Sequence, residues 1–565
     1  MSGPVKVDVL VVGSGAAGLS AAVTAAMHGA SVMVAEKASV LGGTSAWSGG
    51  WLWIPRNPLA RAEGIDEAAD APLTYLQHEM GGEAADIRLQ TFLRYGPEMV
   101  EFFHQRTAVQ FLSGSAMPDF HPSPGAANGG RSVTAHPYDG RLLGDWLHRL
   151  RPPLETISLG GMGIAGGADM AHFFNATRSP RSALYAARRL LRHGWQRLRA
   201  GRGQHLVNGN ALVARLLRSA LDAGVRFQLN APVVRLLQGP PGVSGAVLRS
   251  DSGEIHVEAG AVVLACGGFP HDRQRLAQVV PHAAEGYGHF SAAPPDNQGE
   301  GIRLGESVGG QFDTSLRHPL AWAPVSRVTL ASGQQLMFPH LVERAKPGVI
   351  AVLPSGKRFV NEADSYHDFI AALLAATPAG DTPQAWLLAD RRTLRRYGLG
   401  HARPFPFTPT AWLRTGYLQR GNTLAELAKQ CAIDANALAE TVERFNHFAS
   451  AGEDVDFHRG ASAYNRAQGD HQVTLGPLRE GPFYAVRILP GSLGTFSGLQ
   501  TDEHARVLDE QQQPIPGLYA IGNDMSSVMR GYYPSGGITL GPAMTFGYLV
   551  GKNLAKKTNI NNNIT

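Results

Sequence analysis

The clearest hydrophobic pattern lies at the start of the chain, where two short apolar runs flank a glycine-rich turn and a stretch of small residues. Residues 5–12 are VKVDVLVV and residues 30–35 are ASVMVA. Continuous β-branched runs of this length predict strands buried on both faces, as in a parallel sheet. Between them, the alanine-rich stretch LSAAVTAAMHG predicts a helix. The first fifty residues therefore predict a strand–helix–strand unit of an α/β fold.

The turn after the first strand has the G-x-G-x-x-G spacing of a dinucleotide-binding loop. Gly13 allows the tight turn, Gly15 lets a pyrophosphate approach the backbone, and Gly18 lets the helix pack closely on the strand. The N-terminus of the following helix offers free N–H groups and the positive end of its dipole. Glu36 ends the second strand, where a carboxylate accepts both ribose hydroxyls. Together these features predict one bound dinucleotide.

A second G-x-G-x-x-G pattern, at residues 161–166, follows no convincing strand and precedes an arginine-rich segment, so we interpret it as a loop. A single dinucleotide site argues against enzymes that bind FAD and NAD(P)H in separate Rossmann units. Reduced cofactor would then pass its electrons to an external acceptor: a quinone, an electron-transfer protein or oxygen.

Composition limits the remaining classes of protein. The chain has 565 residues, 44% of them hydrophobic, with 67 glycines, two cysteines and a net charge of +5. Such a chain can form a large core, is too weakly basic to indicate nucleic acid, and has no disulfide framework. The histidines and cysteines show no metal-ligand spacing, so we expect no metal site. With no signal-peptide pattern at its start and no long apolar run, we expect a cytoplasmic protein.

The stretch after Glu36 identifies the cofactor and a family. Residues 36–50 fit the pattern E-K-x-x-x-x-G-G-T-S-x-x-S-G-G, which resembles the flavoprotein superfamily of fumarate reductase and 3-ketosteroid dehydrogenase. Four more stretches match this superfamily in order, so that the resemblance covers nearly the whole chain: 265–269, 355–362, 517–523 and 533–544.

This resemblance implies FAD in a Rossmann-like domain made by both chain ends, residues 1–314 and 496–565, with an inserted α+β catalytic cap at 315–495. No histidine lies between Glu36 and Gly50, where members with covalent flavin carry one, so we expect non-covalent FAD. A helix starting near Leu540 would point its N–H groups at the flavin. The expected cofactor-binding residues are Gly13, Gly15, Ala16, Ala17, Gly18, Glu36, Lys37, Gly42, Gly43, Thr44, Ser45, Ser48, Gly49, Gly50, Ala265, Gly267, Gly268, Gly522, Asn523 and Leu540.

Two chemistries share this scaffold, and arginines separate them. In the fumarate-type enzymes a catalytic arginine precedes the G-K-R-F-V-N-E turn, and here gap-free counting puts Ala345 at its place, although a shift of one residue would bring in Arg344. Near the C-terminus, Pro534 stands where those enzymes carry a clamp arginine. A carboxylate clamp needs such bidentate donors. A fumarate-reductase-like enoate reductase is therefore the less favoured alternative.

The resemblance to 3-ketosteroid dehydrogenases supplies the expected catalytic residues. It implies that the hydroxyl of Tyr533 and the N–H of Gly537 hold a ketone oxygen and stabilise enolate. It also implies that Tyr366 takes the α-proton while flavin N5 takes hydride from the β-carbon. A phenol with an ordinary pKa near 10 needs help from its neighbours to act as a base.

Two departures leave the regiochemistry and substrate open. The Δ1 enzymes have a tyrosine that assists the base where this chain has Phe120 followed by His121, so these two residues are expected in the substrate pocket. His121 and Tyr138 are the candidates to replace the missing tyrosine hydroxyl. Ser535 follows Tyr533 by two residues, as in the Δ4-(5α)-dehydrogenases, and this slightly favours Δ4-(5α) over Δ1 desaturation. A smaller cyclic ketone such as 4-oxocyclohexanecarboxylate is a further alternative.

Residues 178–202 predict a basic amphipathic helix with eight arginines and apolar residues at helical spacing. Such a helix either packs on the protein surface or lies on an anionic bilayer. The resemblance implies a small apolar ketone as the substrate, and the low net charge predicts no nucleic-acid partner. Peripheral membrane contact is one expected use of residues 178–202.

Overall fold

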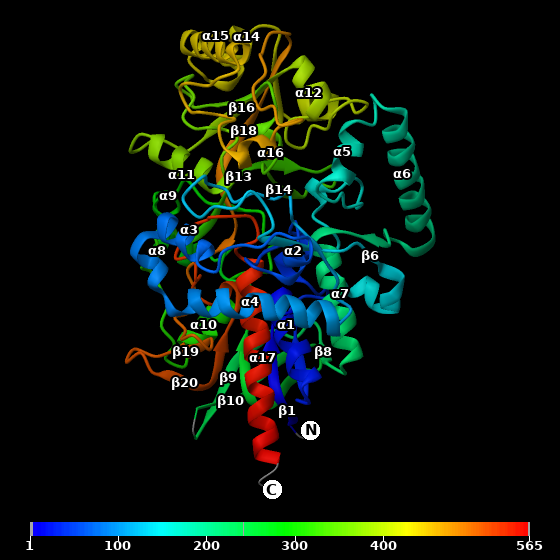
Figure 1. The fold of residues 1–565 in the computed structure, drawn as a ribbon, viewed down its shortest axis with the longest axis vertical. Coiled ribbons are helices and arrows are strands. Elements are labelled where there is room, and N and C mark those ends of the chain that lie inside the picture. The colour runs from blue at the N-terminus through cyan, green and yellow to red at the C-terminus, as the bar shows by residue number, and fades with distance from the viewer. Residues whose placement is uncertain (1–3, 241, 563–565) are drawn as a thin grey trace.

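A computed structural model describes residues 4–240 and 242–562, which form a mixed α/β protein built on two sheets (Figure 1). In Figure 1 the larger sheet lies in the lower half, together with both chain ends, and the second sheet lies in the upper half.

The larger sheet has eight strands and draws on both ends of the chain. Its main path runs β19-β20-β11-β1-β2-β8, and β10 and β9 extend from β11 as an antiparallel pair. The strands are β1 (Val5–Val12), β2 (Val32–Ala35), β8 (Arg226–Gln228), β9 (Val233–Gly239), β10 (Gly242–Ser250), β11 (Gly253–Leu264), β19 (Arg506–Leu508) and β20 (Pro514–Ala520).

Parallel pairing brings the carboxyl ends of the central strands to one edge. Val12, the last residue of β1, pairs with Leu264 of β11 and Ala35 of β2. β20 is also parallel to β11. Since ligands of open parallel sheets bind beyond the carboxyl ends of the strands, this edge is where the predicted cofactor residues gather.

The first helix packs on β1 and β2 of this sheet, and the last helix packs along the first, in blue and red in Figure 1. Small residues make the close approach possible. A Cβ at Gly547 would lie 2.6 Å from the carbonyl oxygen of Ala17, and one at Gly551 would lie 2.7 Å from that of Ala21. The two chain ends are thus locked together by backbone contact rather than by large side chains.

The second sheet has seven strands in the order β14-β13-β18-β16-β15, with β12 and β17 also paired to β18. The domain boundary at residue 315 stays a prediction, although β12 joins this sheet from a point 25 residues earlier. Its strands are β12 (Phe290–Ser291), β13 (Leu320–Thr329), β14 (Gln335–Pro339), β15 (Val349–Val352), β16 (Ala385–Asp390), β17 (Leu418–Gly421) and β18 (Phe483–Thr495).

Two small sheets and the helices complete the fold. The small sheets are formed by β3 (Trp51–Trp53), β4 (Phe111–Ser113) and β5 (Ser132–Ala135), and by β6 (Tyr138–Asp139) and β7 (His205–Leu206). The α-helices are α1 (Ala16–Met27), α2 (Pro58–Ala62), α3 (Ala71–Met80), α4 (Ile87–Arg106), α5 (Ala168–Phe174), α6 (Pro180–Ala200), α7 (Asn208–Asp222), α8 (Arg273–Val279), α9 (Pro281–Ala284), α10 (Glu300–Glu306), α11 (Tyr366–Ala376), α12 (Arg391–Tyr397), α13 (Thr410–Arg414), α14 (Leu424–Cys431), α15 (Ala435–Ala451), α16 (Ala463–Gln468) and α17 (Leu540–Asn562). The 3₁₀ helices are η1 (Gly43–Trp47), η2 (Gly81–Ala85), η3 (Gly140–Arg149), η4 (Glu155–Ile157), η5 (Glu343–Ala345) and η6 (Gly522–Asp524). Within the described residues, no helix combines the length and the apolar character needed to cross a membrane.

A buried ion-pair network fixes the segment that leads into α11. Arg358 contacts Glu362 at 2.7 Å and Asp454 at 2.8 Å, and Arg459 contacts Glu362 at 3.0 Å. Burial alone would raise the pKa of Glu362, but the two arginines outweigh it and lower the pKa to about 2. The carboxylate is therefore charged at neutral pH and holds two arginines in place.

Candidate active site

One cavity of about 1880 Å³ opens at the carboxyl edge of the larger sheet and extends to the second sheet. The dinucleotide loop, the stretch after Glu36 and the N-terminus of α17 line one part of it. The β14 region, α16 and the loop at residues 400–407 line another. The cavity is large enough to hold a dinucleotide and a second molecule together.

Glycine occupies the three positions of the G-x-G-x-x-G loop for different structural reasons. Gly13 has φ +110°, and a Cβ there would lie 2.2 Å from the carbonyl oxygen of Ala265. A Cβ at Gly18 would lie 2.1 Å from the carbonyl oxygen of Gly13, so this glycine is required by helix–strand packing. A Cβ at Gly15 would meet only the Ser45 hydroxyl, at 3.5 Å, and would point into the cavity. The fold itself tolerates a side chain at Gly15, which fits a position kept open for pyrophosphate.

Glu36 is held at the sheet edge by backbone and hydroxyl donors. Its Oε2 accepts hydrogen bonds from the N–H and the hydroxyl of Ser14, at 3.2 and 2.5 Å, and its Oε1 accepts one from the N–H of Ala38 at 2.9 Å. The carboxylate lines the cavity with a fixed orientation. This arrangement suits the ribose hydroxyls of a dinucleotide.

Most of the predicted cofactor residues line this cavity, and three do not. Gly18, Gly42 and Gly268 are packed against protein instead; a Cβ at Gly268, for example, would lie 1.9 Å from the Thr495 hydroxyl. The residues that do line it are Gly13, Gly15, Ala16, Ala17, Glu36, Lys37, Gly43, Thr44, Ser45, Ser48, Gly49, Gly50, Ala265, Gly267, Gly522, Asn523 and Leu540. These residues fit an extended FAD, and α17 begins at Leu540 as the sequence predicts.

Asp524 is a buried acid near the cofactor site that the sequence analysis did not single out. Its carboxylate accepts the N–H of Cys266 at 2.6 Å and that of Gly268 at 2.9 Å. Burial is the main reason that its pKa is raised to about 6, although these two hydrogen bonds lower it. Asp524 thereby ties η6 to the turn after β11 on the cavity wall.

Tyr366 and Tyr533, which are 167 residues apart in the chain, meet at the far wall of the cavity. The hydroxyl of Tyr366 donates a hydrogen bond of 2.7 Å to that of Tyr533. Phe120 packs edge-on against Tyr366 and stacks on Tyr533, with ring centroids 5.6 and 5.7 Å apart. Tyr366 is the first residue of α11, and Ser365 caps this helix by accepting the N–H of Asp368.

Burial controls the ionisation of both phenols. It raises the pKa of Tyr366 well above 10, and it raises that of Tyr533 to about 12 although the hydrogen bond from Tyr366 lowers it. Both hydroxyls are therefore neutral donors near pH 7. Because Tyr533 accepts the hydrogen bond from Tyr366, its own O–H is free to donate a hydrogen bond to a ligand in the cavity.

Gly537 also lies on the cavity wall, in the loop between Tyr533 and α17. Its φ is +101°, and a Cβ would lie 2.6 Å from the backbone nitrogen of Trp53, so only glycine fits. Within the described residues its N–H has no protein acceptor. Tyr533 and Gly537 thus line the same cavity. A tyrosine hydroxyl and a free backbone N–H are donors of the kind that oxyanion stabilisation uses.

The structure does not bring Ser535 or His121 to the cavity lining, contrary to expectation. Ser535 is buried, and its hydroxyl has no hydrogen-bond partner within the described residues. His121 bridges two carboxylates, with Nε2 2.7 Å from Asp368 and Nδ1 2.5 Å from Glu79. Burial disfavours its charge, but these two partners raise its pKa to about 10, so both ring N–H groups are already engaged.

A different tyrosine, Tyr464 on α16, is buried and lines the cavity. Its ring lies 4.4 Å from that of Phe120, and burial raises its pKa. Tyr138, by contrast, lies beside Arg215 and outside the lining. The motifs gave no signal for Tyr464, because only the packing of α16 brings it to the site.

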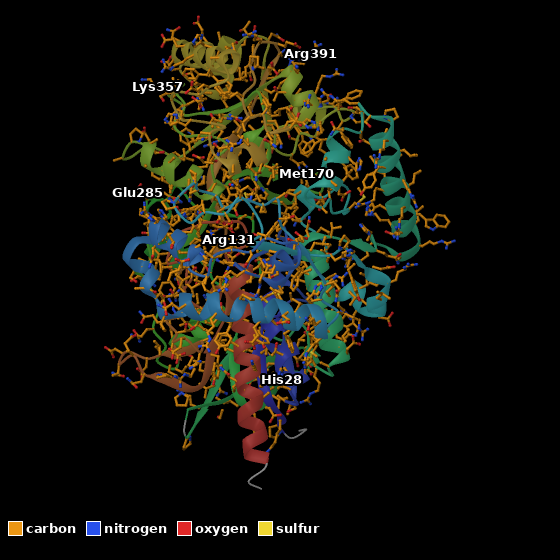
Figure 2. The ribbon with its side chains drawn as sticks, in the orientation of Figure 1. His28, Arg131, Met170, Glu285, Lys357 and Arg391 are labelled. Atoms are coloured by element: carbon orange, nitrogen blue, oxygen red, sulfur yellow. The ribbon has the colours of Figure 1, made fainter. Side chains whose placement is uncertain are left out.

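Arg344 is not available as a carboxylate clamp. It is fully buried, its Nε and Nη1 donate to the carbonyl oxygens of His340 and Glu362 at 3.0 and 2.5 Å, and its Nη2 has no hydrogen-bond partner within the described residues. It does not line the cavity. Arg131, labelled near the centre of Figure 2, is likewise paired with protein, 2.6 Å from Asp119.

Comparison with known proteins agrees with this geometry. A family model described as an FAD binding domain matches residues 8–540. The chain is 39% identical over 556 residues to the 4-oxocyclohex-2-ene-1-carboxylate 5-dehydrogenase of Sinomonas cyclohexanicum, covering 97% of this chain and 94% of that one. It is 35% identical over 567 residues to the 3-oxosteroid 1-dehydrogenase of Mycolicibacterium smegmatis, covering 97% of each.

A solved structure shows the same likeness over the whole chain. The 3-ketosteroid delta1-dehydrogenase of Sterolibacterium denitrificans, in complex with 1,4-androstadiene-3,17-dione, matches with a TM-score of 0.88 and 36% identity, covering 98% of this chain and 100% of that one. The predicted superfamily and its FAD cofactor are thereby confirmed. The chain belongs to the FAD-dependent oxidoreductase family that includes the 3-ketosteroid dehydrogenases and fumarate reductases.

Proposed function

We propose that this flavoprotein desaturates the carbon–carbon bond next to the ketone of a 3-ketosteroid. The observation that carries the proposal is the pair of hydrogen-bonded tyrosines, Tyr366 and Tyr533, on a cavity wall that also includes Gly537. A flavin with a purely structural role would need none of these groups.

Each group has one task in this reaction. The Tyr533 hydroxyl and the Gly537 N–H bind the ketone oxygen and stabilise the negative charge that grows on it as the α-proton leaves. Tyr366 accepts that proton in its phenolate form, which is the minor form at neutral pH because burial raises its pKa, and its oxygen lies 2.7 Å from that of Tyr533. FAD supplies the hydride acceptor. The apolar ring of Phe120 keeps water from the two hydroxyls.

The charges of the cavity favour a neutral substrate. Each lysine or arginine that lines it within the described residues has a protein partner: Lys37 with Glu300, Arg151 with Asp296, Arg396 with Asp470, and Arg197, Arg202, Lys346 and Arg403 with backbone carbonyls. Binding a substrate carboxylate would compete with these contacts. Together with the burial of Arg344 outside the cavity lining, this disfavours dicarboxylate or enoate reduction.

For the position of desaturation we propose Δ1 before Δ4-(5α). The sequence favours Δ4-(5α) only through Ser535, and this residue is buried outside the cavity lining. The likeness to a 3-oxosteroid 1-dehydrogenase and to a delta1-dehydrogenase structure supports Δ1. In this proposal FAD is bound non-covalently and is reoxidised by a quinone, an electron-transfer protein or oxygen.

A second candidate is the desaturation of a small cyclic ketone acid. It is favoured by the 39% identity to a dehydrogenase of 4-oxocyclohex-2-ene-1-carboxylate. The chemistry at Tyr366, Tyr533 and Gly537 would be unchanged. The difference would lie in the part of the cavity away from these residues, where a lining lysine or arginine would give up its protein partner and bind the substrate carboxylate.

Anaerobic mixing of the holoenzyme with three ketones tests the proposal through loss of the visible flavin absorbance. The ketones are a 3-keto-4-ene steroid, a saturated 3-keto-5α steroid and 4-oxocyclohexanecarboxylate, and the product is identified by mass spectrometry and NMR. Bleaching by a steroid with a 1,2-double bond in the product is expected. Bleaching by the small ketone alone would establish the second candidate, whereas reoxidation of the reduced enzyme by fumarate, with no ketone active, would refute both.

A further inference from the structure

The helix α6 presents an apolar stripe to solvent. It stands at the outer edge of the molecule in Figure 1, and Figure 2 shows its side chains projecting outward. Three buried residues attach the helix by one side: Ser182, Ala186 and Gln196. On the opposite side four large side chains are between 56% and 86% exposed: Leu184, Leu191, Trp195 and Leu198. Their spacing places them on one face of the helix.

Arginines lie along one flank of this stripe. Helical spacing puts four of them there, all exposed: Arg181, Arg188, Arg192 and Arg199. Residues 178–202 contain no acid, and of their arginines only Arg189 forms an ion pair within the described residues, with Asp169. The guanidinium of Arg199 lies 4.1 Å from the ring centroid of Trp195. This flank is therefore a row of uncompensated positive charge.

The other flank of the stripe borders the cavity. Ala183, Ala187 and Leu190, which helical spacing places beside the apolar stripe, line the cavity. Four lining residues from three separate segments are also large, apolar and 42–50% exposed, so they form the rim of its mouth: Ile157, Leu190, Phe405 and Phe407. The apolar stripe of α6 thus continues into an apolar rim.

We propose that α6 and this rim dock on an anionic lipid bilayer, with the mouth of the cavity facing the lipid. The leucines and Trp195 enter the interface, and the arginine flank lies against the headgroups, as in interfacial amphipathic helices. A second copy of the chain suits this face less well, because it would add another set of arginines and no acid. A contiguous apolar surface rimmed by charge marks an interaction site rather than an ordinary exposed face.

Docking in this orientation would let an apolar ketone pass from the bilayer into the cavity without crossing water. This route rests on the proposed function, whereas the docking itself does not. Vesicle binding and ketone turnover are separate measurements, so the failure of one is distinguishable from the failure of the other.

Flotation of the holoenzyme with vesicles tests the docking. Vesicles of phosphatidylcholine with phosphatidylglycerol are expected to bind it, and those of phosphatidylcholine alone to bind it more weakly. Leu191→Gln with Leu198→Gln should lower the affinity by about tenfold or more, since two exposed leucines lose their insertion. The matched control, Met27→Gln with Ile87→Gln, changes two exposed apolar residues on α1 and α4 and should bind like wild type. No binding by wild type, or equal binding by the α6 variant, would overturn the proposal, as would a dimer in solution that the α6 variant dissociates.

A dye that reports on polarity tests the orientation. It would be attached to Phe407→Cys on the rim and, as a control, to Ile87→Cys on α4. Labelling of the wild type serves as the blank for Cys266, which lines the cavity, and for the buried Cys431. With anionic vesicles, the emission is expected to shift to the blue at residue 407 and not at residue 87. A bound enzyme with no shift at residue 407 would refute a mouth that faces the lipid.

Discussion

Replacing Tyr533 by phenylalanine isolates a single hydroxyl at the proposed oxyanion site. The ring keeps its packing against Phe120 and Phe496, each 5.7 Å away, and against His367 at 5.5 Å. What is lost is the acceptor of the 2.7 Å hydrogen bond from Tyr366 and the donor to the ketone. Leaving the Tyr366 hydroxyl buried without a partner should cost about 1–3 kcal/mol of folding stability. Removing one oxyanion donor should lower the rate of flavin reduction about 10²–10³-fold.

The assay is stopped-flow reduction of the enzyme-bound flavin by the steroid under anaerobic conditions, with the flavin content and the melting temperature measured in parallel. Tyr138→Phe is the matched control, because this tyrosine is buried but lies outside the cavity. A Tyr533→Phe enzyme that holds its flavin and reacts within about threefold of wild type would refute the oxyanion role.

Three further predictions concern the base, the cofactor and the fold. Burial raises the pKa of Tyr366 above 10, so the ionised fraction of Tyr366 should grow about tenfold per pH unit below that pKa. The rate of flavin reduction by the ketone should therefore rise from about pH 7 to pH 9. Tyr366→Phe should abolish both the activity and this dependence on pH. Gly15→Ala should keep the melting temperature of the apoprotein but lower the flavin-to-protein ratio, whereas equal flavin content would exclude a pyrophosphate contact there. The pKa of Glu362 is lowered from its ordinary value of 4.5 to about 2. The ion pairs of Glu362 therefore stabilise the fold fully at pH values above 4.5, and this stabilisation is lost as the pH falls from 4.5 toward 2. Glu362→Gln should cost about 3–5 kcal/mol in urea unfolding at pH 7, and the exposed Glu443→Gln should cost almost nothing.

The cofactor half of the site is predictable from the sequence because its determinants are local. A strand, a glycine turn, a helix and an acid within forty residues define the edge of the sheet, and Gly13, Gly15 and Glu36 all line the cavity there. The two tyrosines that we propose as catalytic are identified by short motifs around each of them. Even so, only the packing of the two sheets brings Tyr366 within 2.7 Å of Tyr533.

The residues that the sequence misplaces depend on distant partners. His121 is engaged by Glu79 and Asp368, which lie 42 and 247 positions away. Tyr464 reaches the cavity through a helix of six residues whose own pattern says nothing about its neighbours. The two-residue strand β12 likewise joins the second sheet without any hydrophobic periodicity that could have predicted it.

The contact between α1 and α17 has a consequence for the order of assembly during synthesis. Ten consecutive residues of α1, Ala16–Ala25, are buried, and α17 provides part of that cover. The dinucleotide loop leaves the ribosome more than 500 residues before Leu540 does. At about 5–20 residues per second this interval is roughly half a minute to two minutes. For most of its synthesis the nascent chain therefore has a dinucleotide loop and an apolar α1 that α17 does not yet cover. Binding of the flavin becomes one of the last events in the maturation of the protein.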